Sequence, residues 1–281
     1  MKKIFIFLAI LIILGNTQIA QAALKVTPTL LELNANNTKG NYLTASFDVQ
    51  GDANETIRFK IYPSYFKISP QGTMDIIEGN SPDTDNLIKN VRFVPNEFTL
   101  QNGNKQKVRL TITNLKNIPD GESRMVLFLE DVAAKEMFLL SGMKDVTTKL
   151  IVKTRVGIPI YLDKGKFVKC AQIQNLDLRK QDKELQLALK LLSSGNSKVR
   201  YTGKAQIIKD KKLIGEYKIK NHVIGSNNSI STIDEIPLKD IKEIGNYTLR
   251  LVIQYTDEKG RLKSLIKESQ FIIDNLPNSN I

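Results

Sequence analysis

The residues that most often perform enzyme chemistry are scarce in this chain of 281 residues. It contains one histidine, His222, and one cysteine, Cys170. A hydrolase or transferase needs a nucleophile beside a base, paired carboxylates in a cleft, or a metal cluster. His222 lies in a turn-rich stretch, which favours a surface position. No nucleophile elbow, phosphate loop or dinucleotide fingerprint occurs in the sequence.

The remaining chemical candidates are two pairs of adjacent carboxylates. These are Glu130-Asp131 and Asp234-Glu235. Such pairs are common in exported proteins and are more typical of a solvated surface than of a catalytic site, although catalysis by carboxylates alone stays open as an alternative. We therefore predict a protein that is not an enzyme, with no cofactor and no metal site. Cys170 has no second cysteine in the chain with which to form a disulfide.

The N-terminus has the features of a secretory signal peptide. Lys2-Lys3 precede an apolar run from Ile4 to Leu14, and Ala20-Gln21-Ala22 provide a cleavage site. We predict cleavage after residue 22 and a periplasmic location, with an uncleaved anchor as the alternative. No later segment is apolar enough to cross a membrane. Residues 23–281 are enough for two domains of roughly 100 to 150 residues.

Apolar and polar residues alternate along much of the first half of the mature chain. Val108, Leu110 and Ile112 are an example. This period of two predicts strands, which we place at 42–49, 56–62, 91–100, 105–113, 123–129 and 147–158. The polar, turn-rich segment 69–90 is predicted to be a surface connection. Met137 to Leu140 form either a loop exposed for a partner or a short strand or helical turn packed on the core.

The second half repeats this pattern, with strands predicted at 167–173, 183–192, 205–208, 213–219, 245–255 and 262–273. In the second of these, the alternation of Leu185, Leu187, Leu189 and Leu191 favours a strand over a helix. The charged segment 163–166 interrupts the alternation and marks a domain boundary. We predict an all-β protein with two immunoglobulin-like β-sandwich domains in tandem, 23–162 and 163–281.

The charge is concentrated in the second predicted domain. The chain has a formal net charge of +12, and residues 163–281 contain 22 Lys and Arg against 14 Asp and Glu. A basic surface attracts an anionic cell envelope, acidic polysaccharide or acidic proteins, although an ordinary solvated lysine-rich surface explains the same counts. The chain lacks Trp and interleaved aromatic and basic clusters, so nucleic acid is not predicted as a partner.

Three pieces of the chain, in this order, resemble the PapD-like periplasmic chaperones that assemble fimbriae and pili. They are VRFVPNEFTLQNGNKQKVRLTI from Val91, IPDGESRMVLFLE from Ile118 and TKLIVKTRVGIPIYL from Thr148. The resemblance covers the first half of the mature chain well and the second half in general character only. It implies an immunoglobulin-like first domain.

The resemblance also implies a mode of binding. In that family, the last strand of the first domain lends alternating apolar side chains to an incomplete pilin subunit, which is a form of β-strand addition. The matching strand here runs from about Val146 to Ile160. Its candidate donor residues are Val146, Thr148, Leu150 and Val152. The alternative is that these side chains belong to the domain's own core. The implied partners are a pilin-like or fimbrial subunit and an outer-membrane usher.

The family further uses two basic residues in the cleft between its domains to bind the C-terminal carboxylate of the subunit. This sequence departs from that pattern. Gly157 stands where a lysine is expected, and Thr29-Leu30 stand where an arginine is expected. Lys153 and Arg155 are the nearby candidates for the same role.

Two functions follow as hypotheses. The first is a noncatalytic periplasmic chaperone that binds pilus, fimbrial or other surface-fibre subunits by donating a strand. The second is an exported structural or adhesive immunoglobulin-like module that binds envelope components, such as a polysaccharide, through its basic second domain. A chaperone should purify with a small subunit, whereas an adhesive module should purify alone.

Overall fold

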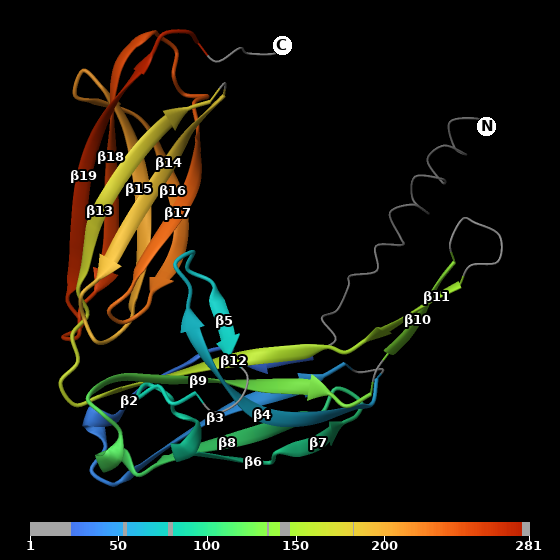
Figure 1. Cartoon of the computed structure of the whole chain (residues 1–281). Helices are drawn as coiled ribbons and strands as arrows, with labels where there is room; N and C mark the ends of the chain where they lie inside the picture. The colour runs from blue at the N-terminus through green and yellow to red at the C-terminus, as the bar shows by residue number, and fades with distance from the viewer. Residues whose placement is uncertain are drawn as a thin grey trace, which may run out of the picture.

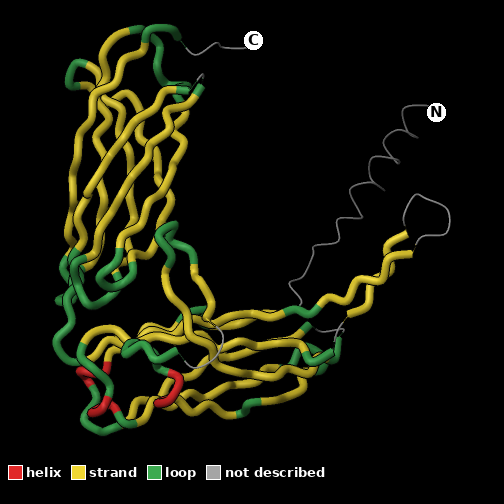
Figure 2. Tube along the Cα trace, in the orientation of Figure 1, coloured by secondary structure: helices red, strands yellow, loops and turns green. Residues whose placement is uncertain are grey.

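The computed structural model describes residues 24–52, 55–77, 81–133, 135–140, 147–181 and 183–276. The predicted signal peptide and Val146 lie outside these ranges. In the described part, the chain forms two β-sandwich domains (Figure 1). Its helical segments there are three short 3-10 turns, all in the first domain (Figure 2): η1 (Ala35–Asn37), η2 (Ile88–Asn90) and η3 (Leu115–Asn117). The prediction of an all-β protein with two sandwich domains is confirmed.

The first domain consists of two packed sheets. One has the order β1-β3-β8-β6 and contains β1 (Leu24–Thr27), β3 (Tyr42–Gly51), β8 (Lys105–Thr113) and β6 (Val91–Val94). The other has the order β2-β12-β9-β4-β5 and contains β2 (Leu31–Asn34), β12 (Arg155–Lys164), β9 (Gly121–Asp131), β4 (Ile57–Ile68) and β5 (Met74–Ile77), with β7 (Glu97–Leu100) also paired to β4. The β2–β12 pair is parallel.

The alternating pattern explains how these sheets pack. Val108, Leu110 and Ile112 of β8 are fully buried, whereas the residues between them face outward. Ile158 and Ile160 of β12 are buried in the same core from the opposite sheet. Each sheet therefore buries one face against the other, as expected of a sandwich.

The predicted last strand of the first domain is divided in two. Thr147–Val152 form β11 and Arg155–Lys164 form β12, with Lys153 and Thr154 between them. β11 pairs with β10 (Lys135–Leu140), and this two-stranded ribbon projects from the end of the sandwich (Figure 1). Met137 to Leu140 therefore belong to a strand, as one alternative held, but this strand lies in the projecting ribbon and not in the sandwich sheets.

The second domain has a three-stranded and a four-stranded sheet. The first, in the order β13-β14-β17, contains β13 (Ala171–Lys180), β14 (Glu184–Ser193) and β17 (Ser229–Pro237). The second, in the order β16-β15-β18-β19, contains β16 (Lys212–Ile224), β15 (Val199–Lys209), β18 (Gly245–Thr256) and β19 (Leu262–Ile273). The predicted strand at 183–192 is confirmed as β14, and its alternating leucines are buried.

The sequence prediction missed β17. Its inward-facing positions alternate Ile230, Thr232, Asp234 and Ile236, and all four are buried. Two of these four are polar, while Ile233 on the outward face is exposed. A hydrophobicity pattern therefore gave no signal, although the backbone has the ordinary period of two.

The expectation that 69–90 is a surface connection holds only in part, because the segment contains β5 and contacts the second domain. β4 continues to Ile68 and turns back into β5, and this hairpin contacts the second domain. The Asn228 side-chain amide donates to the Ile68 carbonyl at 2.9 Å, and the Ser231 N–H donates to the Pro70 carbonyl at 2.7 Å. Two backbone carbonyls at this turn thus accept hydrogen bonds from the second domain, whereas Gln71, Thr73 and Asp75 stay exposed.

An apolar cluster joins the two domains. Phe66, Val126 and Tyr161 of the first domain pack in the same buried cluster as the leucines of β14 and β18. The Phe66 and Tyr161 rings meet edge to face, with centroids 5.5 Å apart and planes at 87°. Domain limits at 23–162 and 163–281 stay a prediction; β12 ends at Lys164 and β13 begins at Ala171.

We expect Phe66→Ala to loosen the connection between the domains. Removing this fully buried ring should lower the free energy of unfolding by about 3–5 kcal/mol and separate the calorimetric unfolding into two transitions. Phe47→Ala is the matched control, because Phe47 is equally buried but belongs to the core of the first domain alone. Equal separation of the transitions in both variants would contradict the expectation.

Candidate partner-binding site

The outer edge of β11 in the projecting ribbon is open in the described chain. β10 and β11 pair antiparallel from Lys135 with Val152 to Leu140 with Thr147. Within the described residues, β11 pairs with no strand other than β10. Leu150 is 44% exposed and the adjacent Ile151 is 60% exposed, so both faces of β11 near its base carry accessible apolar side chains. An open edge with apolar side chains is a template for pairing with another chain.

In β12, every second residue faces the core, and apolar residues at the same spacing continue along β11. Ile158, Ile160 and Leu162 face the core of the first domain, and Val156 packs against it. Leu150 and Val152 have the same parity along the chain, but they lie beyond the end of the sandwich. Leu150 is exposed and Val152 is partly buried. The alternation that points apolar side chains to the core thus continues beyond the end of the sandwich.

Two of the candidate donor residues are described only in part or not at all. Thr148 lies in β11, where its backbone is opposite that of Leu139. Its side chain lies outside the described part, as does the whole of Val146. The structure therefore places Leu150 and Val152 on the ribbon, and the donor roles of all four residues stay predictions.

The open edge extends into the first residues of β12. β2 pairs with β12 only from Ile160 to Asp163. In the described chain, residues 155–159 pair with β9 on one side and with no strand on the other. A partner strand could therefore follow one continuous edge from Thr147 to Pro159.

Lys153 and Arg155 lie at the base of this ribbon, and both are exposed. The Arg155 guanidinium carbon is 4.6 Å from the centre of the Phe128 ring, which is a cation–π distance. The Lys153 ammonium is 3.9 Å from a Glu130 carboxylate oxygen. Burial and the hydrogen bond that the Tyr62 hydroxyl donates to Glu130, at 2.6 Å, raise the pKa of Tyr62.

Gly157 stands where the PapD-like chaperones, which this chain resembles, have a lysine. Local packing explains the glycine at this position. A Cβ at this position would lie 3.0 Å from the Phe128 ring and 3.1 Å from Val126. Both contacts are tighter than ordinary van der Waals separation. A lysine here would therefore require the Phe128 ring to move.

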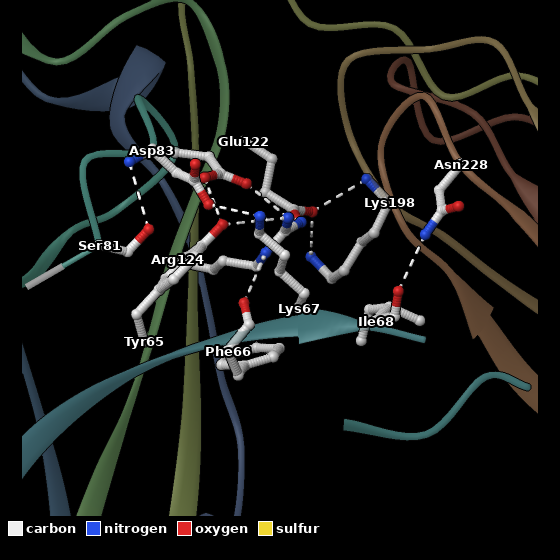
Figure 3. A network of polar contacts seen from close by, with 11 residues as sticks. Tyr65, Phe66, Lys67, Ile68, Ser81, Asp83, Glu122, Arg124, Lys198 and Asn228 are labelled. Carbon is white, nitrogen blue, oxygen red and sulfur yellow. Dashed lines mark hydrogen bonds and ion pairs between the residues drawn. The ribbon is translucent and has the colours of Figure 1, made fainter. Parts of the chain in front are cut away.

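A buried ion cluster lies where the domains meet (Figure 3). Arg124 of β9 bonds to the Glu122 carboxylate at 2.8 Å, to the Asp85 carboxylate, and to the Phe66 carbonyl at 3.2 Å. The Tyr65 hydroxyl donates to Asp85. Burial disfavours the charged guanidinium, but the attraction of Glu122 and Asp85 is stronger in sum and raises the pKa of Arg124.

Lys198 connects this cluster to the second domain. Its backbone N–H donates to Glu122 at 2.9 Å, and its ammonium is 3.5 Å from the same carboxylate (Figure 3). The ammonium also lies 4.0 Å from the centre of the Tyr161 ring. Gly121, at a φ of +110°, permits the close approach of the Asn196 backbone from the second domain. A Cβ at this glycine would lie 2.9 Å from the Asn196 carbonyl oxygen.

A small basic pocket opens beside this cluster. Its volume is about 210 Å³, and it is lined by Glu32, Lys169, Lys198, Arg200 and Thr256. Arg200 and Lys198 lie 3.1 and 3.5 Å from the Glu32 carboxylate. Burial disfavours the Glu32 charge, but these two cations outweigh it and lower the pKa of Glu32.

Sequence reasoning did not find this pocket. The resemblance directed attention to two positions in the first domain, whereas three cations of the pocket come from residues after β12. Lys198 and Arg200 alternate around Val199, and this alternation was the available signal. This signal is not distinctive, because lysine and arginine are frequent throughout the second half of the chain.

The remaining chemical candidates do not gather into a site. Among the described residues, no group of three or more His, Cys, Asp and Glu side chains could hold a metal ion. His222 was predicted at the surface; it is partly buried and faces the turn of the β4–β5 hairpin, where a Cβ on Gly72 would lie 3.1 Å from its ring nitrogen. No described helix is long and apolar enough to span a membrane.

No family model matches this sequence, and no curated protein matches it. Solved structures similar to the chain include several fimbrial chaperones. The class 5 fimbriae chaperone CfaA is 14% identical, with a TM-score of 0.45, over 88% of this chain and 98% of that one. The E. coli chaperone DraB is 12% identical, with a TM-score of 0.40, over 90% and 98%. A complex of Salmonella enterica SafA pilin with the SafB chaperone gives 11%, 0.41, 90% and 97%.

We expect Arg124→Met to destabilise the protein strongly. The variant keeps most of the side-chain volume but leaves Glu122, which has no exposed side-chain surface, with Lys198 as its remaining cation. Breaking a buried ion cluster in this way costs about 3–5 kcal/mol, measurable by urea unfolding. Arg58→Met is the control, because the exposed Arg58–Glu97 pair should contribute at most about 1 kcal/mol. Similar losses in both variants would contradict this expectation.

Glu32 should make the junction between the domains sensitive to acid. Its pKa is lower in the folded protein than the ordinary value of 4.5, so its contribution to stability is present above that pH and disappears as the pH falls through the lowered folded pKa. We expect the stability difference between the wild type and Glu32→Gln, measured by urea unfolding, to shrink below about pH 4.5. A difference that is constant from neutral pH to about pH 3 would show that Glu32 is not the titrating group.

Proposed function

We propose that this protein is a noncatalytic periplasmic chaperone that binds a pilus, fimbrial or other surface-fibre subunit by donating a β-strand. The observation that carries the proposal is the ribbon. β11 has an unpaired edge in the described chain. It carries the exposed Leu150, which has the same parity in the sequence as the core-facing Ile158 and Ile160 of β12. A strand of this kind gains by pairing with a chain that has a complementary open edge.

The proposed complex is formed by β-strand addition along residues 147–159. Backbone hydrogen bonds along the open edge supply affinity, and the alternating side chains set the register. Leu150 and Val152 enter an apolar groove of the subunit, and Val146 and Thr148, which have the same parity in the sequence, are the proposed further donors. Burying an apolar side chain of this size contributes about 1.5–3 kcal/mol.

Lys153 and Arg155 supply the electrostatic part of the proposed interface. They are exposed at the base of the ribbon, where the donated strand joins the sandwich. We propose that they attract an acidic group of the subunit. Because Lys153 lies near Glu130 and Arg155 lies on Phe128, both cations are already oriented by their neighbours before the partner arrives.

Some solved structures similar to this chain are complexes of a chaperone with a pilin or a tip adhesin. The same class of partner is proposed here, on the geometry of the ribbon. An outer-membrane usher is the proposed second partner. The periplasmic location follows from the predicted signal peptide. The competing function, an exported adhesive or structural module, requires no subunit and would leave the ribbon edge without a role.

Leu150→Glu should abolish the complex with a co-expressed pilin-like subunit from the same organism. A buried, unpaired carboxylate in an apolar groove costs several kcal/mol, so about a hundred-fold loss of affinity is expected. The complex can be measured by size-exclusion chromatography and by titration of the purified proteins. Circular dichroism should show that the variant is folded, because Leu150 lies outside the core.

Ile151→Glu is the matched control for this experiment. It introduces the same charge on the same ribbon, but at a residue of the opposite parity, and it should retain most of the affinity. A wild-type protein that never associates with the subunit, or a Leu150→Glu variant that binds as well as the wild type, would reject strand donation. The adhesive module would then be the better hypothesis.

A further inference from the structure

The outer face of the four-stranded sheet in the second domain is hollowed. One groove of about 510 Å³ lies over β15, β16 and β18, and its lining includes Lys204, Lys218, Lys220, Asn221 and Gln254. A second hollow of about 430 Å³ lies further along the same strands and is lined in part by Gln206, Lys211 and Arg250. We refer to these two hollows together as the sheet groove. A volume of several hundred cubic ångströms is typical of ligand sites.

The register of the sheet places the two hollows in line. Lys204 is opposite Lys218 on β16 and opposite Val252 on β18, and Gln206 is opposite Glu216 and Arg250. The Gln206 side chain donates to Glu216 at 2.7 Å where the two hollows meet. The groove therefore follows β15 from Thr202 to Ile208, a length of about 20 Å.

The groove carries more positive charge than its own carboxylates neutralise. Lys204 pairs with Glu216 at 2.9 Å, and Arg250 pairs with Glu268 at 2.6 Å. In the described part of the chain, the exposed ammonium groups of Lys218 and Lys220 have no carboxylate within ion-pair distance. Two cations on one strand face are thus available to a ligand, and this charge favours an anion.

The lining argues against a protein as the ligand. Protein interfaces are enriched in aromatic anchors, whereas none of the residues lining either hollow in the described chain is aromatic and its apolar lining is limited to Ile208, Leu213, Ile219 and Val252. A strand added along β16 would also meet an occupied donor at Lys220, because the Asp234 carboxylate accepts the Lys220 backbone N–H at 2.8 Å. Single-stranded nucleic acid is disfavoured for the same lack of aromatic stacking surfaces.

We infer that the sheet groove binds an anionic polysaccharide. The carboxylates of such a polymer match the unpaired Lys218 and Lys220, and its hydroxyl groups match the amides and hydroxyls of Asn221, Gln254 and Thr202 along the same face. The extended shape of the groove suits a chain rather than a compact ligand. This site is separate from the ribbon and does not depend on strand donation to a subunit.

The full mature protein and a defined oligogalacturonate, a polymer of sugar carboxylates, provide the test. We expect binding by isothermal titration calorimetry that weakens as salt is added. The double variant Lys218→Gln/Lys220→Gln should lose about ten-fold in affinity, because it removes two charge-assisted contacts. Lys183→Gln/Lys190→Gln is the matched control; it removes the same charge from exposed positions elsewhere in the second domain and should bind normally.

Three outcomes would overturn this inference. Equal losses in the two double variants would show that only the net charge matters. If neutral dextran bound as tightly as oligogalacturonate, the charges of Lys218 and Lys220 would not determine binding. Polyglutamate binding as tightly, with the same dependence on Lys218 and Lys220, would indicate an acidic protein partner instead. Complex formation with a pilin-like subunit should be unchanged in Lys218→Gln/Lys220→Gln, so this test and the test of strand donation fail independently.

Discussion

Glu122 is a carboxylate with no exposed side-chain surface at the junction of the two domains, and the surrounding structure neutralises its charge. Arg124 does so from the same strand and Lys198 does so from the second domain, so the full set of partners is present only when the domains are in contact. A buried unpaired charge is far more costly than an exposed one. The cluster therefore makes the contact between the domains specific, while the apolar packing around Phe66 supplies its area.

The ribbon reflects a second constraint: the alternating segment at the end of the first domain is longer than the sandwich core that it covers. The alternation of the last strands of the first domain continues past the end of the sandwich, so Leu150 keeps the parity of Ile158 and Ile160 without a sheet to pack on. Such a face and its open edge are unfavourable in isolation because both remain in contact with water. Strand donation would remove this cost by means of a partner, which is why the proposed function and the fold are linked.

The two proposed surfaces differ in physical character. The ribbon offers backbone hydrogen bonds and apolar side chains, so the partner proposed for it is a polypeptide. The sheet groove offers ammonium, amide and hydroxyl groups on a face whose backbone is already paired, so its ligand is recognised by charge and by side-chain hydrogen bonds. A single chain could hold a subunit through one domain and contact the anionic envelope through the other.

Sequence alone determined the strand period, and therefore the all-β class and the parity that sets Leu150 and Val152 on one face, because alternation is a local property of the backbone. It failed at β17, where Thr232 and Asp234 occupy inward positions, and at β5, whose hairpin with β4 accepts a hydrogen bond from the second domain. The ion cluster, the basic pocket and the sheet groove were decided by tertiary structure. Each combines residues far apart in the sequence, and only the folded chain sets which charges face one another and which remain unpaired.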